Sequence, residues 1–428
     1  MRKVGLYSAL LIAGLAASQA LPGLLGEGYG PVAHAIKLLT MVGLGFIMVH
    51  VGYEFDVDKT RLGSYGWDYL VAATAAAFPW IFCAIYFVYL LAPEGGVGAW
   101  KESLLAARFA APTSAGVLFS MLAAAGLSAT WMYRKARVLA IFDDLDTVLL
   151  MIPLKMLIVG VRWQLGVVVA IMAVLLWIAW RYLHALRIPM TWPWVLAYSV
   201  GIVAVSESIY FASKLMEEVA PIHIEVLLPA FVLGCIAVRY GHEHGHDEAQ
   251  GVEDPHASPS ERRATLIITA AFMVLVGLSM PALQGIAGSP ETVALADEAA
   301  ARAYLPDDPT DPIASTPPAA GLDWGWIAIH VLIITALSNL GKMFPLFCYR
   351  REAHWRERLA VAVAMFPRGE VGAGVLITSL GYGIGGPMIV VAMFSLALNL
   401  LLTGGFIIVV RRLLASVPAP EPALEGAR

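Results

Sequence analysis

Long apolar runs recur along the whole chain and are separated by shorter polar segments. Each run holds roughly twenty residues, the length that an α-helix needs to cross the hydrocarbon core of a bilayer. The pattern predicts spans at residues 4–21, 31–53, 66–92, 100–127, 137–160, 163–184, 192–216, 222–240, 263–284, 323–349, 357–381 and 386–410. It therefore indicates an all-α polytopic membrane protein with about 12 transmembrane helices.

Composition supports this interpretation. Of the 428 residues, 59% are hydrophobic and 14% are charged, whereas soluble domains carry about 25% charged residues. The three cysteines, Cys83, Cys235 and Cys348, lie within or at the edges of apolar runs and lack the spacing of metal ligands. We expect no cofactor.

The basic residues are sorted between two sides of the predicted membrane. When the spans alternate in direction, 19 of the 28 lysines and arginines fall on the side of both termini and four fall on the other. Because cytoplasmic loops carry the excess of basic residues, both termini are predicted to be cytoplasmic. The first 20 residues also resemble a cleavable signal peptide. We interpret them as a retained first helix, because they complete an internal repeat.

Polar segments divide the chain further. We expect a first membrane half at residues 1–240, with helices 1–8, and a second half at residues 263–412. Residues 241–262 form a His-rich cytoplasmic loop between them, residues 286–322 an external loop rich in Pro, Ala and acids, and residues 413–428 a tail. The loop histidines could bind a metal or sense pH, but their alternate spacing fixes no metal geometry, so a solvated linker is favoured.

A weak internal repeat relates the two halves. "GFIMVHVGYEFD" (45–56) ends the second span and "AFMVLVGLSMPAL" (271–283) ends the ninth, and interruptions follow at "AAPTSAGV" (110–117) and "FPRGEVGAGV" (366–375). Seven spans separate the copies, an odd number, so the copies run in opposite directions. Paired Pro/Gly interruptions in inverted halves predict a substrate site near the middle of the membrane of a secondary transporter.

Three acids lie inside the apolar run "AIFDDLDTVLLM" (140–151): Asp143, Asp144 and Asp146. An ionised Asp at the centre of a membrane helix costs roughly 2.5–3.5 kcal/mol, so these acids must face water, pair with bases or carry protons. Neighbouring carboxylates resist ionising together, and a pair of this kind can exchange a proton for a cation. Asp146 lies one turn beyond Asp143, and for it an accessory role and a purely structural role are both open.

The two interruptions hold further candidates. Thr113 and Ser114 follow a proline in the fourth span, where hydroxyls and freed carbonyls can coordinate a small hard cation. Arg368 and Glu370 flank the glycine of the eleventh span. They are candidates to neutralise the partial charges of broken helix ends, or they pair with each other.

Two lysines complete the set of candidates. Lys342, in "LSNLGKMFPLF", lies deep in the tenth span, and its natural partner is Asp143 or Asp144. The alternative, snorkelling to the cytoplasmic end, is disfavoured because two arginines already occupy that end. Lys155 follows Asp144 by eleven residues, about 16 Å of helix rise on the same face, and is expected to line the external path.

Six stretches in order carry a family resemblance: "VGYEFDVDKTRL", "APTSAGVLFSML", "RKARVLAIFDDLDTVLLMIPL", "AFMVLVGLSM", "NLGKMFPLF" and "RERLAVAVAMFPRGEVGAGV". The chain resembles the cation:proton antiporter superfamily, with its Nha/Nap/Kef-type sodium/hydrogen exchanger domain. The resemblance implies inverted-topology repeats with crossed, discontinuous helices 4 and 11. It also implies a core bundle that moves against a dimerising panel, and hence a homodimer.

The resemblance also assigns roles. Asp144 looks like the carboxylate that binds cation and proton, and Asp143 like the acid that pairs with Lys342; two adjacent acids with a lysine are typical of electrogenic members. Thr113 and Ser114 match the extended segment. Asp146 departs from the family pattern and puts the stoichiometry in doubt.

We therefore expect a secondary antiporter rather than an enzyme, exchanging Na⁺ (or Li⁺) for H⁺ in a bacterial-type inner membrane and serving pH homeostasis. Its partners would be monovalent cations, protons and lipid, with no nucleic acid. The nearest alternative is a K⁺/H⁺ antiporter of the Kef-like branch. A remote alternative is an intramembrane aspartyl protease, which needs its two acids on separate helices, whereas here they are contiguous.

Overall fold

The computed structural model describes residues 2–55, 62–92, 97–159, 163–216, 222, 224, 226–238, 259–280, 324–381, 384 and 387–416. Its helices are α1 (Arg2–Leu25), η1 (Gly26–Gly28), α2 (Tyr29–Glu54), α3 (Leu62–Tyr86), η2 (Phe87–Leu91), α4 (Val97–Ala107), η3 (Arg108–Ala110), α5 (Ala115–Ala124), α6 (Trp131–Val159), α7 (Trp163–Arg181), α8 (Trp192–Met216), α9 (Leu227–Ile236), α10 (Pro259–Leu278), α13 (Trp324–Gly341), η4 (Phe344–Phe347), α14 (Trp355–Ala364), α15 (Glu370–Gly381) and α16 (Pro387–Ala415). These residues contain no β-strand.

The helices follow the predicted spans and confirm the all-α polytopic membrane architecture. By length and composition, eight helical segments of the described chain can cross a membrane. α6 is as long as the longest of these, but it carries seven charged side chains among its 29 residues. α9, at 10 residues, is short. Most of the polar loop residues 241–262, and all of 286–322, lie outside the described residues.

Both predicted interruptions are present as breaks in the helices. In the fourth span, η3 ends at Ala110 and α5 begins at Ala115. In the eleventh span, α14 ends at Ala364 and α15 begins at Glu370. Each gap contains a proline, which lacks a backbone N–H and disfavours helical geometry at the preceding residue. Two half-helices therefore end, and two begin, in the interior of the protein.

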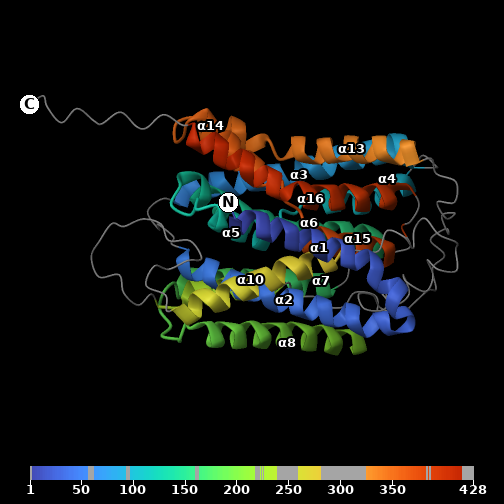
Figure 1. Ribbon diagram of the computed structural model, residues 1–428. Helices are drawn as coiled ribbons and strands as arrows, with labels where there is room; N and C mark the ends of the chain where they lie inside the picture. Colours follow the sequence, from blue (N-terminus) through green and yellow to red (C-terminus); the bar gives the residue numbers. More distant parts are fainter. Residues whose placement is uncertain are drawn as a thin grey trace, which may run out of the picture.

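The helices form two groups. The core bundle comprises α3, α4–η3–α5, α6, α13, α14–α15 and α16, and the panel comprises α1, α2, α8, α9 and α10. α7 packs against α9 of the panel. In Figure 1 the core helices α3, α13, α14 and α16 lie toward the top, and the panel helices α2, α8 and α10 lie toward the bottom. α1 packs against α16 and also contacts α5, which joins the panel to the core.

Two glycine crossings in the panel repeat the same geometry. Gly14 of α1 faces Gly277 of α10, and Gly52 of α2 faces Gly234 of α9. A Cβ atom on any of the four would come closer than 3.0 Å to a carbonyl oxygen of the facing helix, a distance that real Cβ atoms essentially never show. Gly52 and Gly277 occupy the same place in the two copies of the sequence repeat. The two copies of the sequence repeat therefore pack against their neighbouring helices in the same way.

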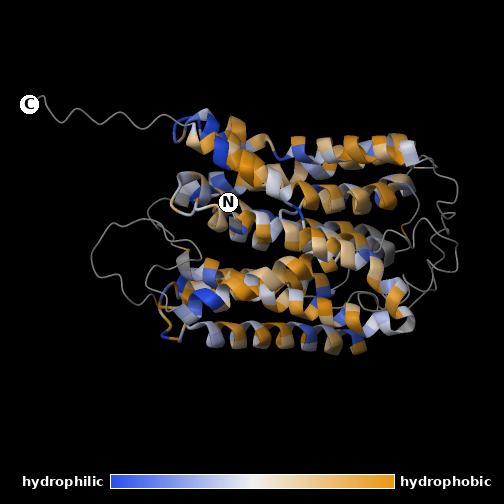
Figure 2. Ribbon diagram, in the orientation of Figure 1, coloured by the Kyte–Doolittle hydropathy of each residue, from blue (hydrophilic) through white to orange (hydrophobic). Residues whose placement is uncertain are grey.

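Hydropathy is distributed as a membrane requires. Figure 2 shows hydrophobic residues along the lengths of the helices, with hydrophilic residues gathered toward their ends, most clearly where α14 begins. α1 begins and α16 ends toward this same left-hand side of Figure 1. The helix ends thus face two aqueous sides, with an apolar belt between them.

Candidate functional site

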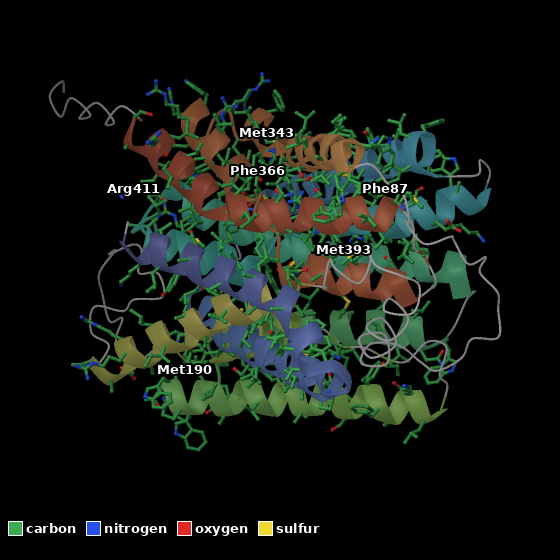
Figure 3. The ribbon with its side chains drawn as sticks, turned by 45° about the vertical axis from the view of Figure 1, so that its right-hand side comes forward. Phe87, Met190, Met343, Phe366, Met393 and Arg411 are labelled. Carbon is green, nitrogen blue, oxygen red and sulfur yellow. The ribbon has the colours of Figure 1, made fainter. Side chains whose placement is uncertain are left out.

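The two broken spans are joined to each other by hydrogen bonds. The backbone N–H of Ser114 donates to the carbonyl oxygen of Pro367 at 3.0 Å. The hydroxyl of Thr113 donates to the carbonyl oxygen of Met365 at 3.1 Å. Met343 and Phe366, beside Lys342 and Pro367, mark this region in Figure 3. The extended segment of each break satisfies backbone groups of the other, so the breaks form one joint.

A buried ion pair lies at this joint. The Lys342 ammonium is 2.8 Å from Oδ1 and 2.9 Å from Oδ2 of Asp143. Oδ2 also accepts a hydrogen bond from the backbone N–H of Thr113 at 2.8 Å. All three residues are 0% exposed. Asp143 is thus held by a lysine from the end of the tenth span and by the backbone of the fourth, and Lys342 selects Asp143 rather than Asp144.

Asp144 is the next residue of α6 and is buried, at 6% exposure. Successive helical residues point about 100° apart, so Asp144 faces a different direction from the ion pair. Its charge still interacts with Lys342. The charge state of Asp144 therefore changes the field at the Lys342–Asp143 pair.

Ser114 caps the half-helix that begins at the joint. Its side chain accepts a hydrogen bond from the backbone N–H of Val117, and its backbone is extended. Both Ser114 and Thr113 are buried, at 1% and 0% exposure. The N-terminus of α5 carries a partial positive charge, which favours a carboxylate such as Asp143 beside it.

Two buried arginines lie near the C-terminal ends of the half-helices that stop at the breaks. Arg368 donates from Nη1 to the carbonyl oxygen of Phe366, just beyond α14, at 2.9 Å, and from Nη2 to that of Ser338 at 2.9 Å. Arg108, at the end of the other half-helix, donates from Nη2 to the carbonyl oxygens of Asp146 and Thr147 of α6 at 3.1 and 3.0 Å. Cations at these C-terminal ends offset the partial negative charge of the broken helices.

Arg108 was not among the residues that the sequence singled out. It is 0% exposed, and its guanidinium lies over the ring of Trp80, 5.1 Å from the centroid. The available signal was an arginine inside an apolar span, four residues before the proline of a break. An intramembrane ionisable residue of this kind is a functional candidate by default.

Asp146 lies on the other side of the acid cluster, against α3. It is 2% exposed, and its carboxylate is hydrogen-bonded to the hydroxyl of Tyr69. The side chains of Lys155 and Glu370 lie outside the described residues. Their backbones belong to α6 and to the first position of α15.

A second buried ion pair lies in the panel. Lys37 of α2 is 3.2 Å from Glu207 of α8, and both residues are less than 10% exposed. The sequence showed both charges but named no partner for either. Because this pair joins two panel helices, it is separate from the acid cluster of the core.

No group of three or more His, Cys, Asp or Glu side chains suited to a resident metal occurs in the described part of the chain. The acid cluster instead combines carboxylates with hydroxyl and backbone oxygens, the donors that a small hard cation prefers. Lys342, Arg108 and Arg368 bring three buried positive charges to Asp143, Asp144 and Asp146. The buried bases and acids of the site are therefore equal in number.

Comparison with known proteins adds to this geometry. The sequence matches the family described as "Sodium/hydrogen exchanger, transmembrane" over residues 1–413. The structure is similar to the sodium proton antiporter MjNhaP1 from Methanocaldococcus jannaschii, at 12% identity and a TM-score of 0.47, covering 97% of this chain and 100% of that one. No match was found among curated proteins. The chain is a secondary transporter of the cation/proton antiporter kind rather than an enzyme, and it belongs to the transmembrane sodium/hydrogen exchanger family.

Proposed function

We propose that this protein exchanges Na⁺ or Li⁺ for H⁺ by alternating access, and that cation and proton compete for Asp144. The observation that carries the proposal is the engagement of Asp143 by three donor contacts, two from Lys342 and one from the backbone of Thr113. Asp144 is the acid beside this fixed pair, and the family resemblance gives it the role of the carboxylate that exchanges its occupant. A buried carboxylate is stable when neutralised, and either ion neutralises it.

The joint supplies the remaining parts of the site. Thr113 and Ser114 place hydroxyl and backbone oxygens beside the acid pair, where they would complete the shell of a partly dehydrated cation. The core bundle then carries the loaded site past the panel, as expected of a protein built from two such groups of helices. Without a bound proton or cation, the Asp144 carboxylate would remain charged in the moving bundle. That uncompensated charge would oppose movement of the bundle across the membrane. Transport of the cation would therefore be coupled to transport of the proton.

Exchange is proposed to be electrogenic, because the Lys342–Asp143 pair responds to the charge at Asp144. We further propose an inner-membrane location, cytoplasmic termini, a role in pH homeostasis and a homodimer, which the sorting of basic residues and the family resemblance support. The membrane halves 1–240 and 263–412 are each proposed to contain one copy of the inverted repeat. The aspartyl protease alternative is excluded, because the family consists of transporters.

The test is transport in proteoliposomes with a trapped pH dye, pulsed separately with Na⁺, Li⁺ and K⁺. We expect Na⁺ and Li⁺ to drive proton movement in the wild type and to drive none in Asp144→Asn. A response to K⁺ alone would support the K⁺/H⁺ exchanger instead. Normal exchange by Asp144→Asn would remove the site assignment, and unchanged electrogenic currents in Lys342→Ala would remove the role of the lysine.

A further inference from the structure

Exposed arginines gather at one end of the core bundle. Two lie toward the end of α16 and two in the turn before α14, and together they form the basic patch: Arg350, Arg351, Arg411 and Arg412. Arg356 of α14 donates to the backbone carbonyl oxygen of Ser416, just beyond α16, so the two elements meet at this point. Figure 3 shows Arg411 near the left-hand end of the core helices.

The carboxylates next to the basic patch have other partners. Glu352 follows Arg351 in the sequence, but it forms an ion pair with Lys135 of α6 at 3.2 Å. Glu357 accepts a hydrogen bond from the backbone N–H of His354 and thereby caps α14. Among the described residues, these neighbouring acids thus leave the charge of the basic patch unpaired. The patch is therefore suited to an anion.

An apolar stripe on α16 leads up to two of these arginines. Leu401 and Ile408, seven residues apart, lie on the same face of the helix, and Arg412 follows Ile408 by four residues. Leu402 and Val409 repeat the spacing beside them. These four apolar residues are between 36% and 44% exposed. Because α16 is long and apolar enough to cross a membrane, the stripe lies in the hydrocarbon region and ends at the arginines.

Trp355, the first residue of α14, marks the level of the basic patch. Its side chain is 48% exposed, and the guanidinium of Arg356 lies over its ring, 5.4 Å from the centroid. Tryptophan is enriched at the boundary between membrane and water. The patch is therefore at the depth of the lipid headgroups.

A phospholipid with an anionic headgroup has the same two parts in the same order. Its acyl chains need apolar surface inside the hydrocarbon region, and its phosphate lies at the boundary. Arginine offers a planar fork of donors that matches a phosphate group. Clusters of about 4–8 basic residues beside a membrane helix are typical of sites for anionic lipids. A soluble phosphate compound would use the arginines but not the stripe.

We propose that the basic patch and the apolar stripe form a binding site for an anionic phospholipid. The headgroup phosphate lies among the arginines, and an acyl chain lies along α16. The site belongs to the core bundle, so it is separate from any lipid contact of the panel. Binding at this site does not depend on the proposed exchange at Asp144.

The test is protection of the full chain against thermal unfolding in detergent, with phosphatidylglycerol, phosphatidylcholine and glycerol phosphate added separately. Phosphatidylglycerol alone is expected to raise the midpoint at low concentration. Arg411→Gln with Arg412→Gln should raise the concentration needed for half of that shift by about tenfold or more. Arg411→Lys with Arg412→Lys retains the charge and should keep most of the affinity. Arg181→Gln with Arg187→Gln removes two exposed arginines outside the patch and should change nothing.

Four outcomes overturn the inference. They are equal protection by phosphatidylcholine, equal protection by glycerol phosphate, undiminished affinity in the glutamine variant, and a glutamine variant that shows no lipid preference but a lower oligomeric mass. The last outcome would assign the surface to a second copy of the chain. If the glutamine variant does not fold, the wild type decides, because protection that is not weakened by about 0.5 M NaCl also overturns the inference. Failure of cation exchange in proteoliposomes would remove the proposed function and leave this site in place.

Discussion

The ammonium of Lys342 and the carboxylate of Asp143 lie 2.8 Å apart with neither side chain exposed, and they come from elements 199 residues apart in the sequence. Attraction between two such charges offsets the cost of removing them from water only while both are present. The pair is therefore a structural tie as well as a candidate part of the transport cycle.

Removal of the lysine alone is expected to destabilise the protein. Lys342→Ala leaves the Asp143 charge buried without its partner, which costs about 3–5 kcal/mol. The double variant Lys342→Met with Asp143→Asn removes both charges and should recover much of the loss. The check is the thermal unfolding midpoint of the purified protein in detergent, with Lys101→Ala, an exposed position, as the control. A single variant as stable as the wild type would contradict the pairing.

The joint between the two breaks yields a prediction at Thr113. Thr113→Val removes the hydroxyl that donates to the Met365 carbonyl and leaves that buried oxygen without this donor, at a cost of about 1–3 kcal/mol. Thr113→Ser keeps the donor. We expect a lower unfolding midpoint and a several-fold slower Na⁺-driven proton flux in the valine variant, with the serine variant near the wild type. Equal losses in both variants would show that the hydroxyl bond is not the cause.

The glycine crossings predict matched effects in the two repeats. Gly52→Ala and Gly277→Ala each force a Cβ atom against a facing backbone, and overpacking of this kind costs about 1–3 kcal/mol. Gly201→Ala in α8, where a Cβ would meet nothing within 4 Å, is the control and should be neutral or slightly stabilising. Unfolding midpoints provide the comparison. A loss in Gly201→Ala equal to the other two would refute the packing argument.

The ionic cluster of Asp68, Lys135 and Tyr349 gives a prediction about pH. Burial, together with the charge of Asp68, raises the pKa of Tyr349 above its ordinary value of 10.0. A raised pKa in the folded state means that the stabilisation is fully present below about pH 10 and is lost as the pH rises beyond it. Tyr349→Phe, which removes the 2.7 Å bond to Asp68, should therefore lower stability by a constant amount between about pH 6 and 9. The difference from the wild type should shrink above about pH 10, and a difference that varies strongly near pH 7 would contradict this account.

Most of the fold was predictable from the sequence because its determinants are local. The length of each apolar run indicated a span, and the prolines at 112 and 367 indicated where spans break. Paired interruptions in inverted repeats also predicted that the two breaks would meet near the middle of the membrane. The exact packing of the helices could not be predicted, because the glycine crossings depend on the rotation of each helix about its axis.

The sequence indicated most of the residues of the site, but it did not determine which of these residues contact each other. The sequence offered Lys342 either Asp143 or Asp144, and the geometry decides through the position of Thr113, whose N–H fixes Asp143. Arg108 bonds to carbonyl oxygens 38 and 39 residues away, and no side-chain pattern records such a contact. Lys37 and Glu207 likewise meet only once α2 and α8 are placed side by side.

The bond from the Ser114 N–H to the Pro367 carbonyl involves no side chain. Replacement of the side chain at position 114 therefore leaves that link between the half-helices in place. Under the proposed function, side chains at this point can change, and with them the preference among alkali metals, while the backbone link between the half-helices is retained. Variants that retain the scaffold but accept a different ion should be obtainable by changing a few side chains at this point.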